Sequence, residues 1–298
     1  MKYKLFGNEI LIKDHHCNFN DQVGMKVNTP YVNLYVRLTD ECQAKCRFCT
    51  FHGKDKGFDE YKFLYTLSRL SEQIKINKVS FTGGEPTVKI DLLNRLLEEV
   101  KSIDKNIWTV VNTNGYDFLG IKPEYTDSIA LSRHHWSNPT NNEIFGLDHY
   151  GYWITDSKDI LEYPHKDKLH LSCNLIKGYT DSAEKCKKFI DFFGAGGVND
   201  FGFVSLMGNN QYSKDHFVDF STIDLGSMPD TMKAAHYSKG SVLQPTCKCA
   251  NYLTCLDDGS IVKSYARYYI SRDECKGILV YDTDGKLKNG FDGEVIYE

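Results

Sequence analysis

Alternating and helical hydrophobic patterns follow one another along the first two thirds of the chain. Residues 31–38 alternate, and the apolar positions share one face, as expected of a strand that is covered on one side. The same pattern predicts further short strands at residues 78–82, 107–112, 129–131, 168–175 and 201–206. Apolar positions at helical spacing predict helices between them, at residues 63–74, 92–100 and 183–193, and more weakly at 138–145 and 157–163.

The order strand, helix, strand predicts right-handed units that build a parallel sheet. Six such units indicate an α/β fold, a partial (β/α)6 barrel, in which the chemistry belongs at the C-terminal ends of the strands. From about residue 222 the pattern changes to short polar segments with Asp-rich turns, which indicates a small β-rich appendage. We therefore expect an N-terminal extension at 1–29, a barrel at 30–221 and a C-terminal domain at 222–298.

Composition and charge narrow the range of partners. The 298 residues carry 36 Lys and Arg against 40 Asp and Glu, a net charge of −4, and no long basic run interrupts this balance. Binding to nucleic acid or to an anionic membrane is therefore not expected. No stretch approaches the roughly 18 apolar residues of a membrane span. The N-terminus also lacks the apolar segment of a secretion signal, so a cytoplasmic location is expected.

Three of the ten cysteines lie in the loop that follows the first predicted strand. Cys42, Cys46 and Cys49 are separated by three and by two residues. A structural zinc site normally takes four protein ligands, whereas a [4Fe–4S] cluster held by three thiolates keeps one iron open for another ligand. The spacing therefore favours an iron–sulfur cluster. The alternative is a zinc site that His52 or a further Cys completes.

This cysteine loop, together with the turn after the second predicted strand, resembles the radical S-adenosylmethionine (radical SAM) superfamily. The resemblance rests on the cysteine spacing, on Phe48 before the last Cys, and on the run Gly83-Gly84-Glu85-Pro86. It extends over about residues 31–207, where 113–115 is similar to the nucleotide-side turn of the family and 174–178 to its fifth-strand segment. The partial barrel of the family agrees with the strands predicted from the hydrophobic pattern.

The resemblance implies a [4Fe–4S] cluster on the three cysteines, S-adenosylmethionine as cofactor and a flavodoxin- or ferredoxin-type reductant. Reductive cleavage of the cofactor would give a 5′-deoxyadenosyl radical that removes an unactivated hydrogen. The two glycines would let the backbone approach the methionine group, and Arg133 would clamp the carboxylate. The full set of implied cofactor contacts is Phe48, Gly83, Gly84, Glu85, Pro86, Asn114, Ser132, Arg133 and Asn174.

Four further cysteines gather in the C-terminal part, and they resemble the first hairpin of SPASM and twitch auxiliary-cluster domains. That hairpin would place a second Cys at position 264, where this chain has Ser. A second [4Fe–4S] cluster is one interpretation, and zinc or free thiols are the alternatives. A thiol that ligates no metal could donate a hydrogen atom, and Cys249 and Cys255 are the candidates. The candidate ligands are Cys247, Cys249, Cys255 and Cys275.

These features predict an enzyme that attacks a C–H bond of a small polar natural product, such as a sugar, an aminoglycoside or a nucleoside, by epimerisation or dehydrogenation. A maturase of a ribosomally made peptide is the second interpretation, because residues 1–29 are too few for an added leader-binding domain. A third, non-enzymatic interpretation is an iron–sulfur or zinc binding module. That module would not cleave S-adenosylmethionine.

Overall fold

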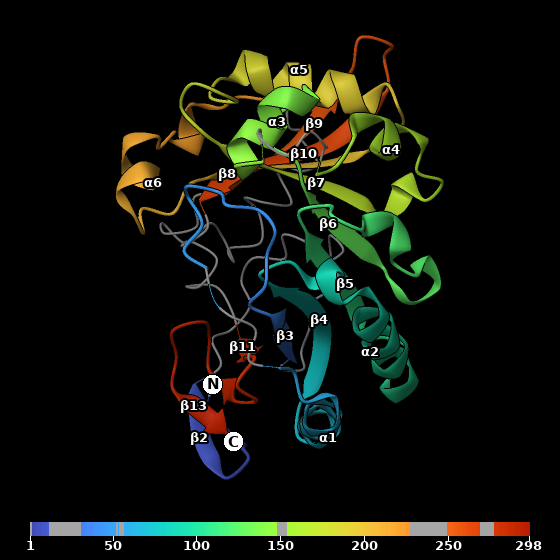
Figure 1. Ribbon diagram of the computed structural model, residues 1–298, viewed down its shortest axis with the longest axis vertical. Coiled ribbons are helices and arrows are strands. Elements are labelled where there is room, and N and C mark those ends of the chain that lie inside the picture. Colours follow the sequence, from blue (N-terminus) through green and yellow to red (C-terminus); the bar gives the residue numbers. More distant parts are fainter. Residues whose placement is uncertain are drawn as a thin grey trace, which may run out of the picture.

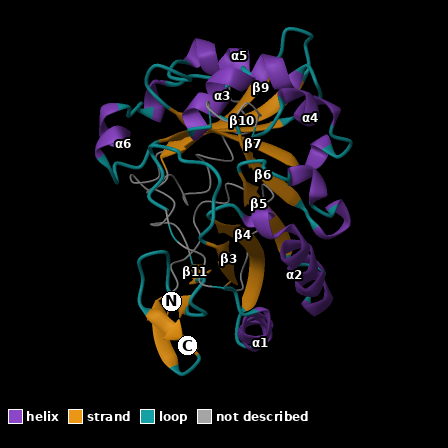
Figure 2. Ribbon diagram, viewed as in Figure 1, coloured by secondary structure: helices purple, strands orange, loops and turns teal. Residues whose placement is uncertain are grey.

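Six parallel strands form the centre of the protein. The computed structural model describes residues 2–11, 31–51, 53, 57–147, 154–226, 249–268 and 277–298. Neighbouring strands pair in chain order and curve around a concave side, as Figure 1 and Figure 2 show. The six predicted strands and the partial barrel are thereby confirmed. The strands are β3 (Tyr31–Thr39), β4 (Lys75–Gly83), β5 (Trp108–Thr113), β6 (Ser128–Ser132), β7 (Leu169–Leu175) and β8 (Asp200–Ser205).

Helices cover the convex side of this sheet. The longest are α1 (Glu60–Ser71), α2 (Ile90–Ile103) and α5 (Ala183–Gly194), each at a position predicted from its apolar spacing. Capping side chains fix where two of them begin, because Asp59 accepts a hydrogen bond from the backbone of Lys62 and Ser182 accepts one from Lys185. The shorter helices are α3 (Asn138–Phe145), α4 (Ser157–Glu162) and α6 (Gln211–Asp215). None of the helices in the described ranges is both long and apolar enough to cross a membrane.

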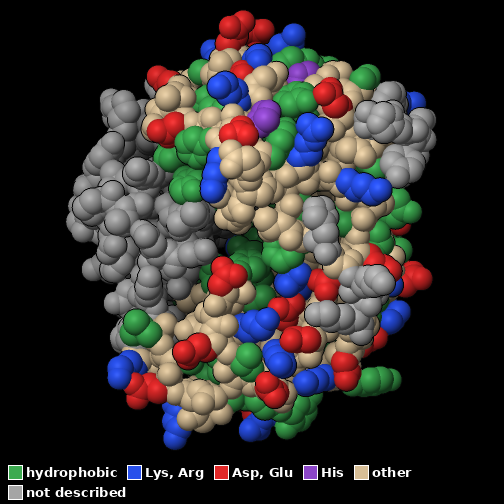
Figure 3. Space-filling view, turned by 60° about the vertical axis from the view of Figure 1, so that its left-hand side comes forward, with side chains coloured by type: hydrophobic (Ala, Val, Ile, Leu, Met, Phe, Trp, Pro, Cys, Tyr) green, Lys and Arg blue, Asp and Glu red, His purple; other side chains and the backbone are tan. Residues whose placement is uncertain are grey.

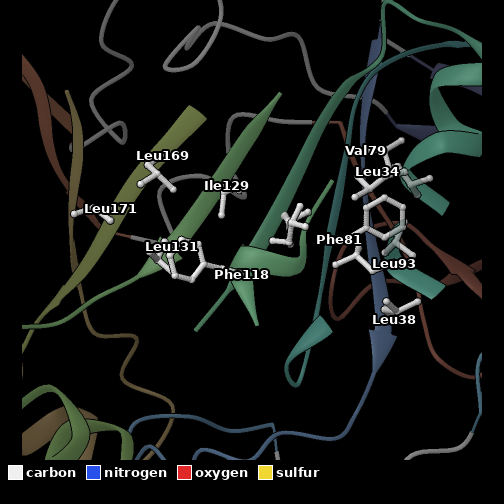
Figure 4. Close-up of a cluster of buried hydrophobic side chains, with 14 of the residues drawn as sticks. Leu34, Leu38, Val79, Phe81, Leu93, Phe118, Ile129, Leu131, Leu169 and Leu171 are labelled. Carbon is white, nitrogen blue, oxygen red and sulfur yellow. The ribbon is translucent and has the colours of Figure 1, made fainter. Parts of the chain in front are cut away.

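The hydrophobic core lies between the helices and the outer face of the sheet. It consists of every second residue of the strands and of the apolar side chains of the helices, and most of these side chains are almost completely buried. Figure 4 shows part of this core along β3, β4, β6 and β7, where aliphatic and aromatic side chains pack together. Labelled members are Leu34, Leu38, Val79, Phe81, Leu93, Phe118, Ile129, Leu131, Leu169 and Leu171.

The C-terminal part is rich in β-structure, as predicted, and it joins the barrel sheet at both edges. The hairpin β9 (Cys249–Cys255) and β10 (Ile261–Tyr268) pairs through β10 in parallel with β8. The strand β11 (Ile278–Tyr281) pairs in parallel with β3 and continues into β12 (Leu287–Lys288) and β13 (Val295–Tyr297). The boundaries at 29/30 and 221/222 stay predictions.

The N-terminal residues form a small hairpin beside the C-terminus. Its strands are β1 (Lys2–Leu5) and β2 (Asn8–Leu11), which pair antiparallel. Asn8 donates a side-chain hydrogen bond to the carbonyl of Ile296 over 2.7 Å, and the rings of Phe6 and Tyr297 stack at 4.3 Å. The two ends of the chain therefore lie side by side, as Figure 1 shows.

The concave face of the sheet is polar, and we call it the lumen face. On each strand its members alternate with the core residues, so their side chains point away from the helices. Asn112 donates to Ser80 over 2.9 Å across two strands, and the ammonium of Lys78 lies over the ring of Tyr35. Figure 3 shows a hollow in the surface between the upper and lower halves of the molecule. The lumen face includes Tyr35, Lys78, Ser80, Asn112, Ser132, His170, Ser172, Asn174, Tyr265 and Arg267.

Candidate active site

The cysteine loop begins at the C-terminal end of β3 and crosses the concave side of the sheet, where Figure 1 shows it in blue. Two contacts hold it there. The backbone of Lys45 donates to the carbonyl of Phe145 over 2.8 Å, and Asn210 donates its side-chain amide to the carbonyl of Arg47 over 3.0 Å. The loop is thus fixed between α3 and α6, above the open end of the barrel.

The three cysteines of this loop lie together against an apolar pocket. Cys46 is buried, and Cys42 and Cys49 are partly exposed. Burial raises the pKa of Cys42 to about 11, with smaller contributions from Glu85 and Cys49, and burial raises the pKa of Cys46 further. Because only thiolates ligate metal, a bound cation would have to favour the ionised forms of Cys42 and Cys46. The pocket is formed by Ala44, Phe145, Leu147 and Ile154.

Hydrogen-bond donors face two of the sulfur atoms. The side-chain amide of Asn114 donates to the Sγ of Cys42 over 3.5 Å, and the backbone N–H of Phe51 donates to the Sγ of Cys49 over 3.4 Å. Such N–H···S bonds stabilise thiolate sulfur and tune iron–sulfur clusters. The donor set therefore fits a [4Fe–4S] cluster on three cysteines.

The alternative of a zinc site has no support among the described residues, where no three His, Cys, Asp or Glu side chains are placed to share one metal ion. In a cubane cluster the thiolates bind different irons, so they need not converge on a single point. His52, the fourth ligand considered from the sequence, lies outside the described residues.

The turn after β4 packs directly on the first residues of the cysteine loop. The backbone of Gly84 donates to the carbonyl of Thr39, and that of Glu85 donates to the carbonyl of Glu41, both over 2.7 Å. A Cβ atom at position 84 would clash with the carbonyl of Glu41. Gly83 has a φ of +136°, which side chains disfavour. The glycines thus allow two loops to meet, and their contact with S-adenosylmethionine stays a prediction.

Glu85 connects this turn to the end of β5. Its carboxylate is buried and accepts hydrogen bonds from Thr87, from the hydroxyl of Thr113 over 2.6 Å and from the backbone of Asn114 over 2.6 Å. Burial raises the pKa of this carboxyl group above its usual range, and the hydrogen bonds oppose the shift. Pro86 begins the short 3₁₀ turn that follows. Glu85 therefore has a structural role, whatever it also offers to the cofactor.

Phe48 and Asn174 both contact a buried histidine. The ring of Phe48 meets His134 edge-on at 5.4 Å, and the Nδ1 of His134 accepts a hydrogen bond from the backbone of Asn174 over 3.1 Å. Burial lowers the pKa of His134 to about 3, so this imidazole is neutral. The side chains of Asn174 and Ser132 are half-buried on the lumen face, where they can reach a bound molecule.

Arg133 does not have the environment that a carboxylate clamp requires. Its guanidinium is completely buried and donates to the carbonyls of His135, Thr155 and Trp136 and to the side-chain oxygen of Asn138. Burial lowers its pKa to about 9. These bonds hold the chain segments that flank α3, because a buried cation must satisfy its donors. The geometry gives Arg133 a structural role in place of the role expected from the sequence.

The C-terminal cysteines separate in space as far as they are described. The backbone of Cys249 pairs with Arg267, which is level with Val204 near the C-terminal end of β8. Cys255 is exposed and pairs with Ile261, beyond the opposite end of β8. A thiol there cannot reach the open end of the barrel, so the geometry disfavours Cys255 as a hydrogen donor.

The second cluster stays a prediction, because two of its candidate ligands, Cys247 and Cys275, lie outside the described residues. Ser264 stands where the resemblance to SPASM and twitch hairpins would place a Cys, and its hydroxyl group lies 2.8 Å from that of Thr254 in a buried pair.

The sequence did not predict that residues beyond the expected barrel boundary contribute to the lumen face. Tyr265 and Arg267 lie on β10, which falls beyond the expected barrel boundary at 221. The alternation of Lys263, Tyr265 and Arg267 with Ser264 and Ala266 is the signal that could have identified them.

This chain is similar to one protein family and to several curated proteins. The model of the Radical SAM superfamily matches residues 36–141. The GTP 3′,8-cyclase of Aquifex aeolicus is 26% identical over 270 residues, which cover 79% of this chain and 82% of that protein. A probable GTP 3′,8-cyclase of Thermococcus kodakarensis is 28% identical over 160 residues, 51% of this chain and 50% of that protein.

Among solved structures, SuiB of Streptococcus suis has a TM-score of 0.53 at 15% identity and is similar over 87% of this chain and 60% of its own. This similarity concerns the fold alone.

Proposed function

The chain carries a radical SAM domain at residues 36–141 and is an enzyme that uses a [4Fe–4S] cluster and S-adenosylmethionine, and from this premise we propose that it removes a hydrogen atom from a small polar substrate in the barrel lumen. Cys42, Cys46 and Cys49 would hold the cluster. When bound, the cluster and its cofactor supply a 5′-deoxyadenosyl radical. The protein orients the cofactor and substrate and excludes water around them.

The cofactor would lie where the ends of β3, β4 and β5 meet. The turn 83–86 offers backbone atoms to the methionine group, and Asn114 stands beside Cys42 at the end of β5. Phe48 offers an apolar surface and its peptide group to the adenine. Asn174 and Ser132 offer hydrogen bonds to the ribose from β7 and β6.

One observation supports the choice of substrate class: the lumen face of the sheet, which the cysteine loop crosses, is polar. Hydroxyl, amide and imidazole groups line it, together with Lys78 and Arg267. Such groups hydrogen-bond a sugar, an aminoglycoside or a nucleoside better than an apolar molecule. The names of the relatives, GTP 3′,8-cyclase, support a nucleoside-containing substrate.

The outcome of the reaction depends on what meets the substrate radical. Epimerisation needs a hydrogen-atom donor, for which Cys249 is the candidate, and dehydrogenation needs an electron acceptor, which a second cluster would supply. A flavodoxin- or ferredoxin-type reductant, a cytoplasmic location and the lack of binding to nucleic acid or membrane belong to the same proposal.

The test is a substrate screen with reconstituted, anaerobically reduced enzyme. GTP, other nucleosides and nucleotides, aminoglycosides, sugars and short peptides are added one at a time, and 5′-deoxyadenosine is measured by mass spectrometry. We expect a small polar compound to increase 5′-deoxyadenosine formation, and its deuterated form to transfer deuterium into that product. Stimulation by peptides alone would contradict the proposed substrate class and favour the peptide maturase.

A further inference from the structure

Tyr265 crosses the lumen face from β10 to β7. It pairs with Gly202 of β8, and Gly202 pairs in turn with Ser172 of β7. A Cβ atom at position 202 would clash with the phenol of Tyr265. Because Gly202 has no side chain, the ring of Tyr265 can lie across β8, where it stacks with the imidazole of His170 at 5.2 Å and an angle of 15°.

His170 connects this phenol to a carboxylate. Its Nε2 lies 2.7 Å from the hydroxyl of Tyr265, and its Nδ1 lies 3.0 Å from the Oδ1 of Asp200. Burial alone would raise the pKa of Asp200, but His170 lowers it below its ordinary value, so the carboxylate is ionised. An ionised carboxylate only accepts, which places the proton of a neutral His170 on Nδ1 and leaves Nε2 as the acceptor for the phenol.

Arg267 faces the same hydroxyl from the other side. Its NH2 group donates to the phenol oxygen of Tyr265 over 2.7 Å, and its guanidinium lies 4.2 Å from the centre of that ring. Both residues are almost completely buried. A fixed cation at this distance favours negative charge on the phenol oxygen and on any oxygen bound beside it.

The arrangement follows a general pattern of acid–base sites, in which a hydroxyl group meets a base that a third group orients. We propose that Tyr265 is an acid–base residue of the substrate site, with His170 as the acceptor of its proton and Asp200 as the positioning residue. This inference rests on the proposed function, since it assigns Tyr265 to a substrate that carries a hydroxyl group.

The proposed step moves only protons, and no group is oxidised or reduced. The O–H bond of a substrate hydroxyl breaks and an O–H bond forms on Tyr265, while the former phenol proton forms an N–H bond on Nε2 of His170. The imidazolium that results is paired with Asp200, and the substrate oxygen keeps its electron pair and its negative charge near Arg267.

The same residues lead the proton out of the lumen. Asp200 is the first residue of β8, at the end of the sheet opposite the cysteine loop, and its side chain is 43% exposed. Tyr265 lies at the middle of β8, and Arg267 lies one lumen position closer to the open end. A proton on His170 can therefore pass to solvent at the end of the barrel where β8 begins, away from the cysteine loop.

The deciding experiment is ¹⁵N NMR of the imidazole of His170 in the reconstituted, oxidised enzyme, with the signal assigned by its loss in His170→Gln. We expect a protonated Nδ1 and an unprotonated Nε2. In Tyr265→Phe, which keeps the ring over Gly202, the Nε2 signal should shift while Nδ1 keeps its proton. The control Tyr252→Phe removes a phenol that bonds the carbonyl of Ile223 on the outer side, and it should leave His170 unchanged.

A second arm uses GTP as the probe. If GTP is turned over, Tyr265→Phe should lower the yield of product per 5′-deoxyadenosine at least tenfold, and Tyr252→Phe should not. Equal yields in the wild type and Tyr265→Phe would overturn the inference.

The NMR result decides whether or not GTP reacts. A proton on Nε2 would make His170 a donor to the phenol, which would overturn the inference and leave the proposed function standing. Failure of the wild type to form 5′-deoxyadenosine would instead overturn the proposed function, whichever tautomer His170 adopts.

Discussion

The side-chain amide of Asn114 donates a hydrogen bond to the sulfur of Cys42 over 3.5 Å. The same asparagine accepts a hydrogen bond from Gln43 over 3.0 Å, and its backbone donates to Glu85. The ends of β3, β4 and β5 are thus connected at one point, directly beside the first cysteine. The position of that sulfur depends on three strand ends that are far apart in the sequence.

Replacing Asn114 with Ala should make the cluster harder to reduce. An N–H···S bond stabilises the reduced cluster, so its loss shifts the reduction potential to a more negative value. The potential is measured by a redox titration followed by electron paramagnetic resonance. Asn112→Ala, which removes the hydrogen bond from β5 to Ser80 on β4, is the control and should leave the potential unchanged. An unchanged potential in Asn114→Ala would show that this amide does not act on the cluster.

Replacing Gly84 with Ala should displace the turn 83–86 from the cysteine loop. The new Cβ would meet the backbone of Glu41, which cannot rotate away as a side chain can. We expect at least a tenfold loss of affinity for S-adenosylmethionine in a binding titration and a destabilisation of about 2 kcal/mol. At Gly208, which follows β8, a Cβ would only touch the Cγ of Lys214 at 3.8 Å, so Gly208→Ala is the matched control. Equal cofactor affinity in the two variants would refute the proposed role of the turn.

Asp282 should stabilise the fold in a pH-dependent way. Its Oδ1 accepts from Arg37 over 2.9 Å and its Oδ2 from Lys288 over 2.6 Å, and Arg37 also binds Asp40 at the base of the cysteine loop. Burial by itself would raise the pKa of Asp282. The combined effect of Lys288 and Arg37 is larger and opposite, so the pKa of Asp282 lies below its ordinary value. A depressed pKa in the folded state means that the stabilisation is complete above the ordinary pKa, about 3.9, and is lost as the pH falls below it.

The variant Asp282→Asn should therefore lower the free energy of unfolding by about 1 to 2 kcal/mol at pH 7. The difference from the wild type should disappear in acid, as denaturant titrations at several pH values would show. The control is Asp284→Asn, since the Asp284 side chain is exposed and lies 3.9 Å from Lys286. A difference that stays constant with pH would contradict this account.

The iron content of the purified, reconstituted chain tests the second cluster. If the C-terminal cysteines hold one, the wild type should contain about eight irons per chain and the variant without these four cysteines about four, at four irons per cubane. A wild-type value near four, with all of these thiols open to alkylation in the folded protein, would exclude a second cluster. The cysteines replaced are Cys247, Cys249, Cys255 and Cys275.

Local patterns predicted the fold well because the barrel repeats one simple unit. The alternation in β3 and the apolar spacing in α2 follow directly from which face of each element meets the core. The hairpin β1–β2 was not predicted. Its strands are only four residues long, and contacts with the C-terminus hold them, which a local pattern does not contain.

The sequence predicted those site residues whose type alone indicates their chemistry. It missed those whose role depends on the residues that surround them in the fold. The spacing of three thiols already indicates a cluster. Arg133 is different, because its role depends on the carbonyl groups of His135, Thr155 and Trp136 that fold around it. Tyr265 reaches His170 only through the pairing of β10 with β8, across 95 residues of sequence.

The most direct test of the central claim compares the wild type with a variant in which Cys42, Cys46 and Cys49 are all replaced by Ala. Each protein is reconstituted anaerobically and reduced, and 5′-deoxyadenosine is measured by mass spectrometry. A control variant, Cys186→Ala, removes a buried thiol from α5 and should keep its cluster and its activity. The account predicts 5′-deoxyadenosine from the wild type and the control and none from the triple variant. Undiminished formation by the triple variant would contradict it.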